Sequence, residues 1–209
     1  MTKKLSDDLD LISAPPDQLG YFFETINSTQ YTVPIDENFL QPSYYRGVVN
    51  MMNQANEQDA VFFTINSGGG RMDGLLSLLD AIDNTSAVTV ADITGECHSA
   101  ASILALNCDQ VIVGRRAEML IHEIRYGVGG KSSDNLSHVQ HIKKISDKLI
   151  WETYEGFLDD DEIESVLNGK ELFLDSEEIV ERLNARDEYR KALAEALKEA
   201  DEDNPGLTD

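Results

Sequence analysis

Three short segments hold the residues whose types and spacing could do chemistry. They are residues 64–70 (TINSGGG), residues 95–101 (GECHSAA) and residues 119–122 (MLIH). The first supplies a glycine turn after an apolar run, the second places Ser99 at the start of a helix-like stretch, and the third ends on His122. A hydroxyl nucleophile, an imidazole base and unbonded backbone N–H groups are what acyl transfer by a serine requires.

Each of these residues also has an ordinary structural interpretation. Ser99 alone would more often cap a helix, the glycines could form a plain turn, and His122 could be a satisfied core histidine. Cys97 is an alternative nucleophile, although it precedes the predicted helix and therefore lacks an adjacent N–H group for an oxyanion. Neither a P-loop nor a Gly-x-Ser-x-Gly elbow surrounds these residues.

Alternating apolar segments predict the elements that must position these residues. Strands are expected at residues 21–23, 31–33, 60–65, 87–91, 111–113 and 119–121, and helices at residues 43–53, 75–82 and 100–106. This order predicts an α/β domain with a largely parallel sheet and right-handed crossovers. Ligands of such sheets bind just beyond the strand ends, which is where the three segments fall.

The second half of the chain changes character. Residues 125–133 contain three glycines and predict a mobile strand or turn, and residues 134–157 predict one long helix. Shorter helices are expected at residues 159–167, 176–183 and 186–200. The resulting organisation is a flexible arm over residues 1–20, a main domain over residues 21–185, and a C-terminal helix with an acidic tail over residues 186–209.

Charge and composition exclude several classes of function. The chain has 39 acidic and 17 basic residues, a formal net charge of -22, which argues against nucleic acid or anionic membranes as partners. No apolar stretch approaches the roughly 18 residues of a membrane span, and no secretory signal is evident, so a cytoplasmic protein is expected. The two cysteines are too few for a disulfide framework, and no Cys/His spacing predicts a metal site.

From about residue 21 to residue 183, the order and spacing of the three segments resemble ClpP, the proteolytic subunit of the Clp proteases. The resemblance implies a ClpP/crotonase-like fold of repeated β-β-α units with a protruding handle over residues 123–157. It implies a serine endopeptidase that cleaves unfolded or extended polypeptides inside stacked rings, typically of seven subunits. It further implies no cofactor, and a separate AAA+ unfoldase as a partner, because this chain has no nucleotide motif.

The resemblance also implies a catalytic triad. Ser99 would be the nucleophile and His122 the general base. The acid that orients the histidine is an aspartate in ClpP-like proteins, and the matching residue here is Glu171. Asp175 and Asp187 remain alternatives for this third position.

Two backbone N–H groups would complete the site by the same resemblance. They belong to Gly70 and Ala100, which would hold the oxyanion. An extended substrate would add as a strand beside residues 69–72 and 125–129. The residues implied in substrate binding are Gly69, Arg71, Met72, Arg125 and Gly127.

Several positions depart from the family's pattern and keep other functions open. Gly68 replaces a proline, Ala100 a methionine and Glu171 an aspartate. One alternative is a catalytically inactive or regulatory ring subunit, and another is a phage-type protease that processes capsid or scaffold proteins. A signal-peptide-peptidase-like or acyl-CoA enzyme of the wider crotonase architecture is a further alternative. The former would use a lysine base and a membrane anchor, and the latter has no need for Ser99 and His122 together.

Overall fold

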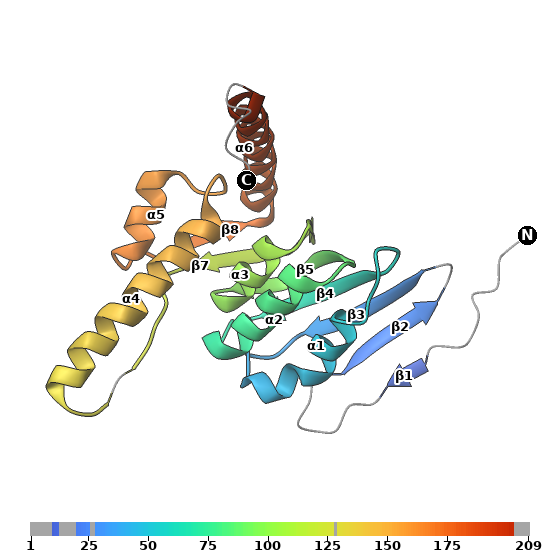
Figure 1. Ribbon diagram of the computed structural model, residues 1–209, viewed down its shortest axis with the longest axis horizontal. Coiled ribbons are helices and arrows are strands. Elements are labelled where there is room, and N and C mark those ends of the chain that lie inside the picture. The colour runs from blue at the N-terminus through green and yellow to red at the C-terminus, as the bar shows by residue number, and fades with distance from the viewer. Residues whose placement is uncertain (1–9, 13–19, 26–27, 128, 203–209) are drawn as a thin grey trace, which may run out of the picture. The chain divides into compact units, whose positions relative to one another are not determined.

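The computed structural model describes residues 10–12, 20–25, 28–127 and 129–202 (Figure 1). The rest of the predicted arm over residues 1–20 lies outside the described residues, and so do residues 203–209 of the tail. The chain divides into two compact units, each of which is described by itself. One consists of Met1–His122 and Glu171–Ser176, and the other of Glu123–Lys170 and Glu177–Asp209.

The first unit is built on one eight-stranded sheet. Its strand order is β1-β2-β3-β4-β5-β7-β8, and β6 also pairs with β5. The pairs β3–β4, β4–β5, β5–β6 and β5–β7 are parallel, whereas β1–β2, β2–β3 and β7–β8 are antiparallel. The strands are β1 (Asp10–Ile12), β2 (Tyr21–Thr25), β3 (Thr29–Ile35), β4 (Ala60–Ser67), β5 (Val88–His98), β6 (Gln110–Val113), β7 (Glu118–Ile121) and β8 (Leu172–Asp175).

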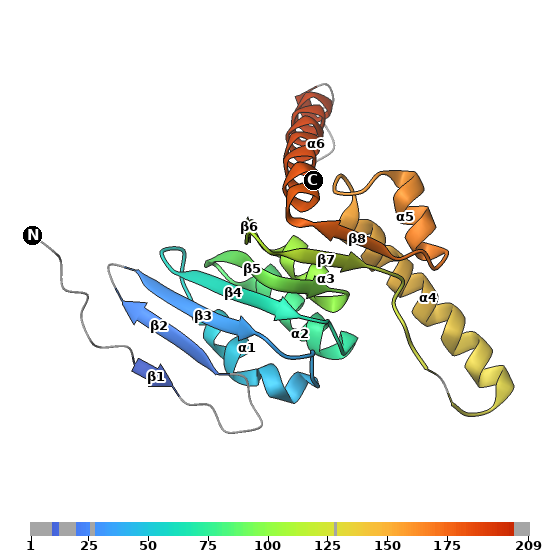
Figure 2. The same cartoon turned by 180° about the vertical axis from the view of Figure 1, so that it is seen from behind.

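Helices cover one face of this sheet. They are η1 (Pro42–Tyr45), α1 (Arg46–Met52), α2 (Met72–Asn84) and α3 (Ala100–Asn107), and the opposite views show α1, α2 and α3 on the same side (Figures 1 and 2). Leu75 and Leu78 of α2 are fully buried, as is Phe63 of β4. Burial of each such side chain stabilises the fold by roughly 1.5–3 kcal/mol. The parallel centre and the helical layer confirm the ClpP-like α/β fold that the sequence predicts.

The predicted strands and helices of this unit are present, but three strands differ from expectation. β1 lies within the segment expected to be an arm, and β8 is a strand that the sequence analysis did not predict. β5 continues to His98 instead of ending before Gly95. It continues because Asn66 Oδ1 accepts a hydrogen bond from Glu96 N at 3.0 Å, where the register between β4 and β5 shifts.

The second unit contains α4 (Ser132–Tyr154), α5 (Asp160–Leu167) and α6 from Glu177 to its end (Ser176–Glu202). α5 begins with a capping box, in which Asp159 accepts from Glu162 N and the Glu162 side chain accepts from Asp159 N. The Arg182 guanidinium of α6 binds the Glu162 carboxylate through two hydrogen bonds of 2.7 and 2.8 Å. α4 matches the predicted long helix, whereas the described residues between Glu123 and Lys131 form no strand.

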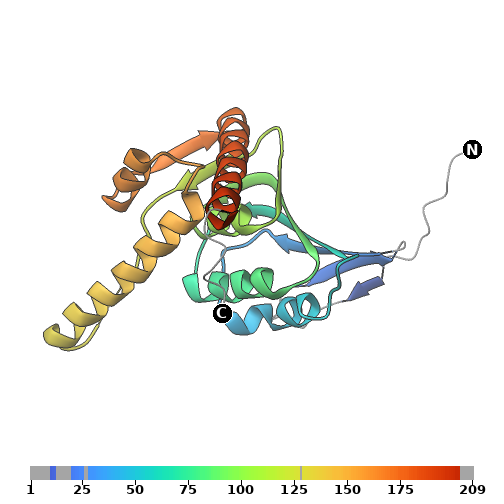
Figure 3. The same cartoon turned by 45° about the horizontal axis from the view of Figure 1, so that its top comes forward.

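The prediction of two helices after residue 175 was wrong. α6 is a single continuous helix of 27 residues (Figure 3). The middle of this helix is polar and has no strong periodic pattern of apolar residues. Arg186 is nevertheless buried there, and its Nη2 donates to Thr153 O at 3.2 Å. This tertiary contact lies in the segment that the sequence analysis divided into two helices. In the described residues, no helix combines the length and apolar character needed to span a membrane.

Candidate active site

Ser99 has an unusual backbone at the junction of β5 and α3. Its φ is 56° and its ψ is -119°, and it is the one non-glycine residue with a positive φ among those described. Such a conformation costs on the order of 1–3 kcal/mol and is found where surrounding structure enforces it. The Ser99 side chain makes no capping hydrogen bond to α3, so the interpretation of this serine as an ordinary helix cap was wrong.

Hydrogen bonds on both sides fix the Ser99 backbone. Ser99 N donates to Leu120 O of β7 at 2.8 Å. Ser99 O accepts from Ser102 N at 3.0 Å, from Ser102 Oγ at 2.7 Å and from Ile103 N at 3.3 Å. The strained serine is therefore held between a sheet strand and the first turn of a helix.

The glycine turn packs directly against Ser99. Gly69 has a φ of 93°, and a Cβ placed on it would lie 2.7 Å from Ser99 Cβ and 3.1 Å from Ala100 N. Gly70 has a φ of 141°, and its Cβ would meet the backbone of Phe39. Both positions require glycine, because a side chain would adopt an unfavourable φ and displace neighbouring backbone.

A short bridge with Phe39 holds the other side of this turn. Phe39 N donates to Gly69 O at 2.7 Å, and Arg71 N donates to Phe39 O at 2.9 Å. Among the described residues, nothing accepts a hydrogen bond from the N–H of Gly70 or of Ala100. Ala100 begins α3, where the first backbone N–H groups of a helix have no partner within the helix.

The strand registers bring the backbone positions of Ser99, His122 and Glu171 to one region of the first unit. His98 of β5 is paired with Leu120 of β7, so Ser99 and His122 both follow the paired ends of these strands. The last β7–β8 pair is Ile121 with Leu172, so His122 and Glu171 each stand one residue beyond it. If this antiparallel register extends by one residue, their Cα atoms are about 4.5–5.5 Å apart. His122 is half-buried and Glu171 is exposed.

The other candidate acids are on β8 and on α6. Asp175 is at the far end of β8, where it pairs with Glu118, about 13 Å along the strand from Glu171. Asp187 lies on α6 in the second unit. The register therefore favours Glu171 over Asp175 as a neighbour of His122.

Cys97 is poorly suited to be a nucleophile. Its side chain is completely buried, and burial raises the pKa of the thiol far above its usual value. Cys108 is also buried, and burial raises its pKa to about 12. The reactive form of cysteine is the thiolate, which such burial suppresses. The alternative of a Cys97 nucleophile is therefore disfavoured.

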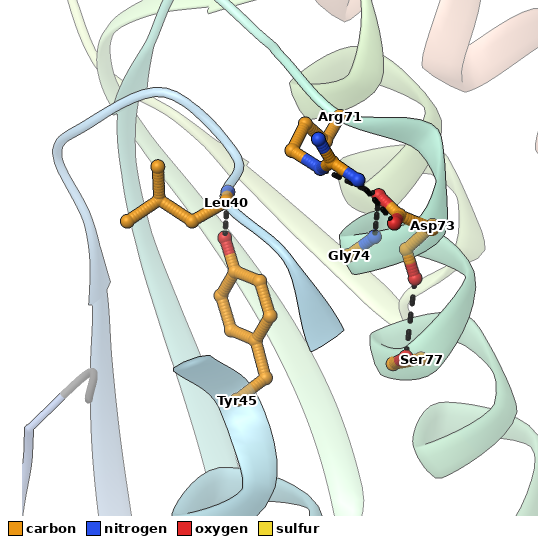
Figure 4. A network of polar contacts seen from close by, with 6 residues as sticks. All are labelled: Leu40, Tyr45, Arg71, Asp73, Gly74 and Ser77. Atoms are coloured by element: carbon orange, nitrogen blue, oxygen red, sulfur yellow. Dashed lines mark hydrogen bonds and ion pairs between the residues drawn. The ribbon is translucent and has the colours of Figure 1, made fainter. Parts of the chain in front are cut away.

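The predicted substrate-binding residues divide between the two units. Gly69, Arg71 and Met72 lie on the glycine turn and at the start of α2, whereas Arg125 and Gly127 lie in the irregular segment of the second unit. The Arg71 guanidinium faces the Asp73 carboxylate, with Nε to Oδ1 at 2.9 Å and Nη2 to Oδ2 at 2.6 Å (Figure 4). This contact lowers the pKa of Asp73.

Hydrogen bonds hold the segment before α1 close to the glycine turn. Tyr45 Oη accepts a hydrogen bond from Leu40 N at 3.0 Å (Figure 4). Ser67 Oγ donates to Glu37 O at 2.7 Å. An open, acidic cleft of about 440 Å³ lies between these segments. Its lining residues are Asp36, Glu37, Asn38, Leu40, Asn66, Ser67, Gly68 and Glu96.

The fold and site define an α/β protein with a serine on a strained strand-to-helix junction beside a glycine turn. The Clp protease family model matches residues 35–181, which is more than half of the chain, and the chain belongs to that family. Its members are ClpP-like peptidases that typically assemble into rings. The matched region contains Ser99, His122 and Glu171. A search of curated proteins finds no match to this sequence.

Proposed function

We propose that this chain is a serine endopeptidase in which Ser99 is the nucleophile, His122 the general base and Glu171 the residue that orients His122. The observation that carries the proposal is the Ser99 backbone, which is strained, hydrogen-bonded to Leu120 and packed against Gly69. A serine that served only as a cap would need neither the positive φ nor a glycine against its Cβ.

The proposed reaction follows the acyl-transfer sequence of a serine triad. Ser99 Oγ attacks the scissile carbonyl carbon while His122 takes the hydroxyl proton. The carbonyl oxygen becomes an anion, which the N–H groups of Gly70 and Ala100 stabilise. His122 then gives the proton to the departing amine, and a water molecule releases the acyl group by the same steps. Loss of one oxyanion donor would cost about 10²–10³ in rate.

The bridge at Phe39 indicates how a peptide would bind to the glycine turn. Phe39 already uses Gly69 O and Arg71 N, so that edge of the turn is occupied. Alternate backbone groups of an extended segment point to opposite edges, which leaves Gly70 and Met72 to pair with an extended substrate. The backbone N–H of Arg71 would not pair with a peptide, and Arg71 would contribute through its side chain. Arg125 and Gly127 remain proposed substrate contacts.

We further propose the setting that the family suggests. The active sites would face the chamber of a ring of about seven subunits, in the cytoplasm, and a separate AAA+ unfoldase would supply unfolded polypeptide. The substrate is a polypeptide chain, and the proposed chemistry uses no cofactor. Native mass spectrometry of the full chain would test the ring, since a stable monomer with full activity would contradict it.

A fluorophosphonate probe tests the nucleophile directly. The probe should form a covalent adduct on Ser99, located by peptide mass spectrometry, and should label Ser77→Ala as well as the wild type. Ser77 is a suitable control because its hydroxyl lies within α2, where its Oγ donates to Asp73 O at 3.1 Å. Ser99→Ala and His122→Ala should abolish both labelling and peptide cleavage. An adduct on Cys97 would contradict the proposal.

One observation favours a second candidate, a non-catalytic subunit of a mixed ring. Glu171 has a longer side chain than the family's aspartate and is exposed, so its hold on His122 would be weaker. This alternative predicts ring assembly with no probe adduct at Ser99. It also predicts that mixing with an active partner subunit changes the partner's rate.

A further inference from the structure

A second imidazole lies beside the proposed nucleophile. His98 is the last residue of β5, and 16% of its side chain is exposed. Its Nε2 atom is buried and lies 3.3 Å from Glu118 Oε1 of β7. The contact is short enough for an ion pair, but its angles do not make it a hydrogen bond, and Nε2 has no hydrogen-bond partner among the described residues. The contact joins a largely buried imidazole on β5 to a carboxylate on β7.

Carboxylates from three strands lie around this contact. Glu118 is the register partner of Glu96 on β5 and of Asp175 on β8, so three carboxylates form a row across adjacent strands. Like charges directly opposite each other destabilise a sheet. Arg115 and Arg116 are exposed in the turn before β7.

The same contact lies at the junction that strains Ser99. His98 is paired with Leu120, and Leu120 O accepts the Ser99 N–H bond of 2.8 Å. His98 O lies 2.7 Å from the position that a Cβ on Gly69 would occupy, so the glycine turn packs on this residue too. Beyond the strand pairing of β5 with β7, the end of β5 therefore contacts β7 through the backbone of Ser99 and through the side chain of His98.

The position of Glu118 along β7 also matters for His122, the proposed general base. Glu118 lies two residues before Leu120, and His122 lies two residues after it. Because His98 Nε2 contacts Glu118, the His98 imidazole lies toward the start of β7. His122 follows the other end of this strand. The contact with Glu118 thus keeps a second imidazole out of the position where it could compete with His122 for the Ser99 hydroxyl.

We propose that His98, through its contact with Glu118, is a positioning residue for Ser99. The pair holds the end of β5 on β7, so that Ser99 keeps its positive φ and its hydroxyl stays with His122. The inference rests on the proposed function. It concerns two residues that the sequence analysis did not select, and the contact that identifies them exists only in the folded sheet.

The kinetics of Ser99 labelling test the role. Full-length protein is treated with a fluorophosphonate probe over a range of probe concentrations, which separates probe binding from the covalent step. His98→Gln and Glu118→Gln should each lower the maximal labelling rate about ten- to hundredfold and leave the half-saturating probe concentration nearly unchanged.

Two further variants sharpen this comparison. The double variant His98→Gln/Glu118→Gln should label no more slowly than the slower single variant, because both changes remove one contact. Glu152→Gln removes a glutamate whose Oε1 lies 3.3 Å from Lys148 Nζ on α4, and it should keep the wild-type labelling rate. Strictly additive losses in the double variant, or a wild-type maximal rate in both single variants, would overturn the inference.

Hydrogen exchange supplies a readout that does not depend on activity. The Ser99 amide should exchange several-fold faster in His98→Gln and in Glu118→Gln than in the wild type under the same conditions. Equal exchange in all three proteins would overturn the inference, even for a protein that the probe does not label. A wild type that exchanges as expected but is not labelled at Ser99 would instead contradict the peptidase proposal alone.

Discussion

Ser99 and Gly69 lie against each other so closely that a Cβ on the glycine would be 2.7 Å from the Cβ of the serine. The two residues come from segments that are 30 positions apart in the chain, at the ends of adjacent parallel strands β4 and β5. Their contact combines a strained nucleophile candidate with a turn whose N–H groups are directed by positive φ angles. Changes at either residue should therefore affect both the stability and the activity of the protein.

The first prediction concerns Gly69. Gly69→Ala should lower the free energy of unfolding by about 1–3 kcal/mol, because the new methyl group requires an unfavourable φ and meets Ser99 and Ala100. It should also reduce probe labelling of Ser99 by about 10² or more, since the serine would be displaced. Urea unfolding and labelling kinetics measure the two effects.

Gly68→Ala is the matched control for Gly69→Ala. Gly68 has no positive φ, and its Cβ would be 3.4 Å from Asn38 Oδ1, an ordinary contact. The change should leave labelling intact and raise the free energy of unfolding by about 0.4–1 kcal/mol, because it restricts the unfolded chain. Equal losses of unfolding free energy and of labelling rate in Gly69→Ala and Gly68→Ala would show that the turn does not distinguish these two positions.

The second prediction concerns the strain at Ser99. Ser99→Gly should be more stable than Ser99→Ala by about 1–2 kcal/mol, because glycine adopts a φ of 56° readily whereas alanine keeps the strain. Both variants should lack peptidase activity. Thermal unfolding of the two proteins tests this difference, and an alanine variant that is the more stable one would contradict the strain.

The third prediction concerns the orienting acid. Glu171→Gln should lower kcat for peptide cleavage by at least about tenfold with little change in KM, because the amide would orient His122 less well than the carboxylate. Asp187→Asn should keep the wild-type kcat. Steady-state kinetics with a fluorogenic peptide provide the measurement. A normal kcat in Glu171→Gln, together with a loss in Asp187→Asn, would move the orienting role to the latter residue.

The fourth prediction concerns pH and the ion pair within the second unit. The Arg182 hydrogen bonds lower the pKa of Glu162 in the folded protein. A lowered folded pKa means that the stabilisation is present above the pKa of the unfolded chain, about 4.3, and is lost as the pH falls through the lower folded value. Arg182→Met should therefore cost roughly 1–3 kcal/mol at pH near 7 and much less below pH of about 3.

Urea unfolding of Arg182→Met and wild type at the two pH values measures this loss. Lys148→Met is a control, because its pair with Glu152 is exposed and should contribute little at either pH. A cost in Arg182→Met that does not depend on pH would assign the effect to packing of the arginine stem instead of its charge.

Local pattern predicted most of the first unit. The apolar runs at residues 60–65 and 119–121 became β4 and β7, and the spacing of Leu75 and Leu78 became the buried face of α2. β8 was missed because its four residues alternate too briefly to give a period, and its pairing with β7 creates it. The continuity of α6 was missed because contacts of Arg182 and Arg186 with the rest of the second unit hold it.

The sequence by itself determined the residue types of the site, its three segments and the family, because a serine before an apolar helix, a glycine run and a strand-end histidine are local features. Tertiary structure alone decided the backbone of Ser99, the burial of Cys97 and the pairing of His98 with Glu118. These depend on which strands are neighbours and in which register, and no local pattern specifies contacts between strands that are distant in the chain.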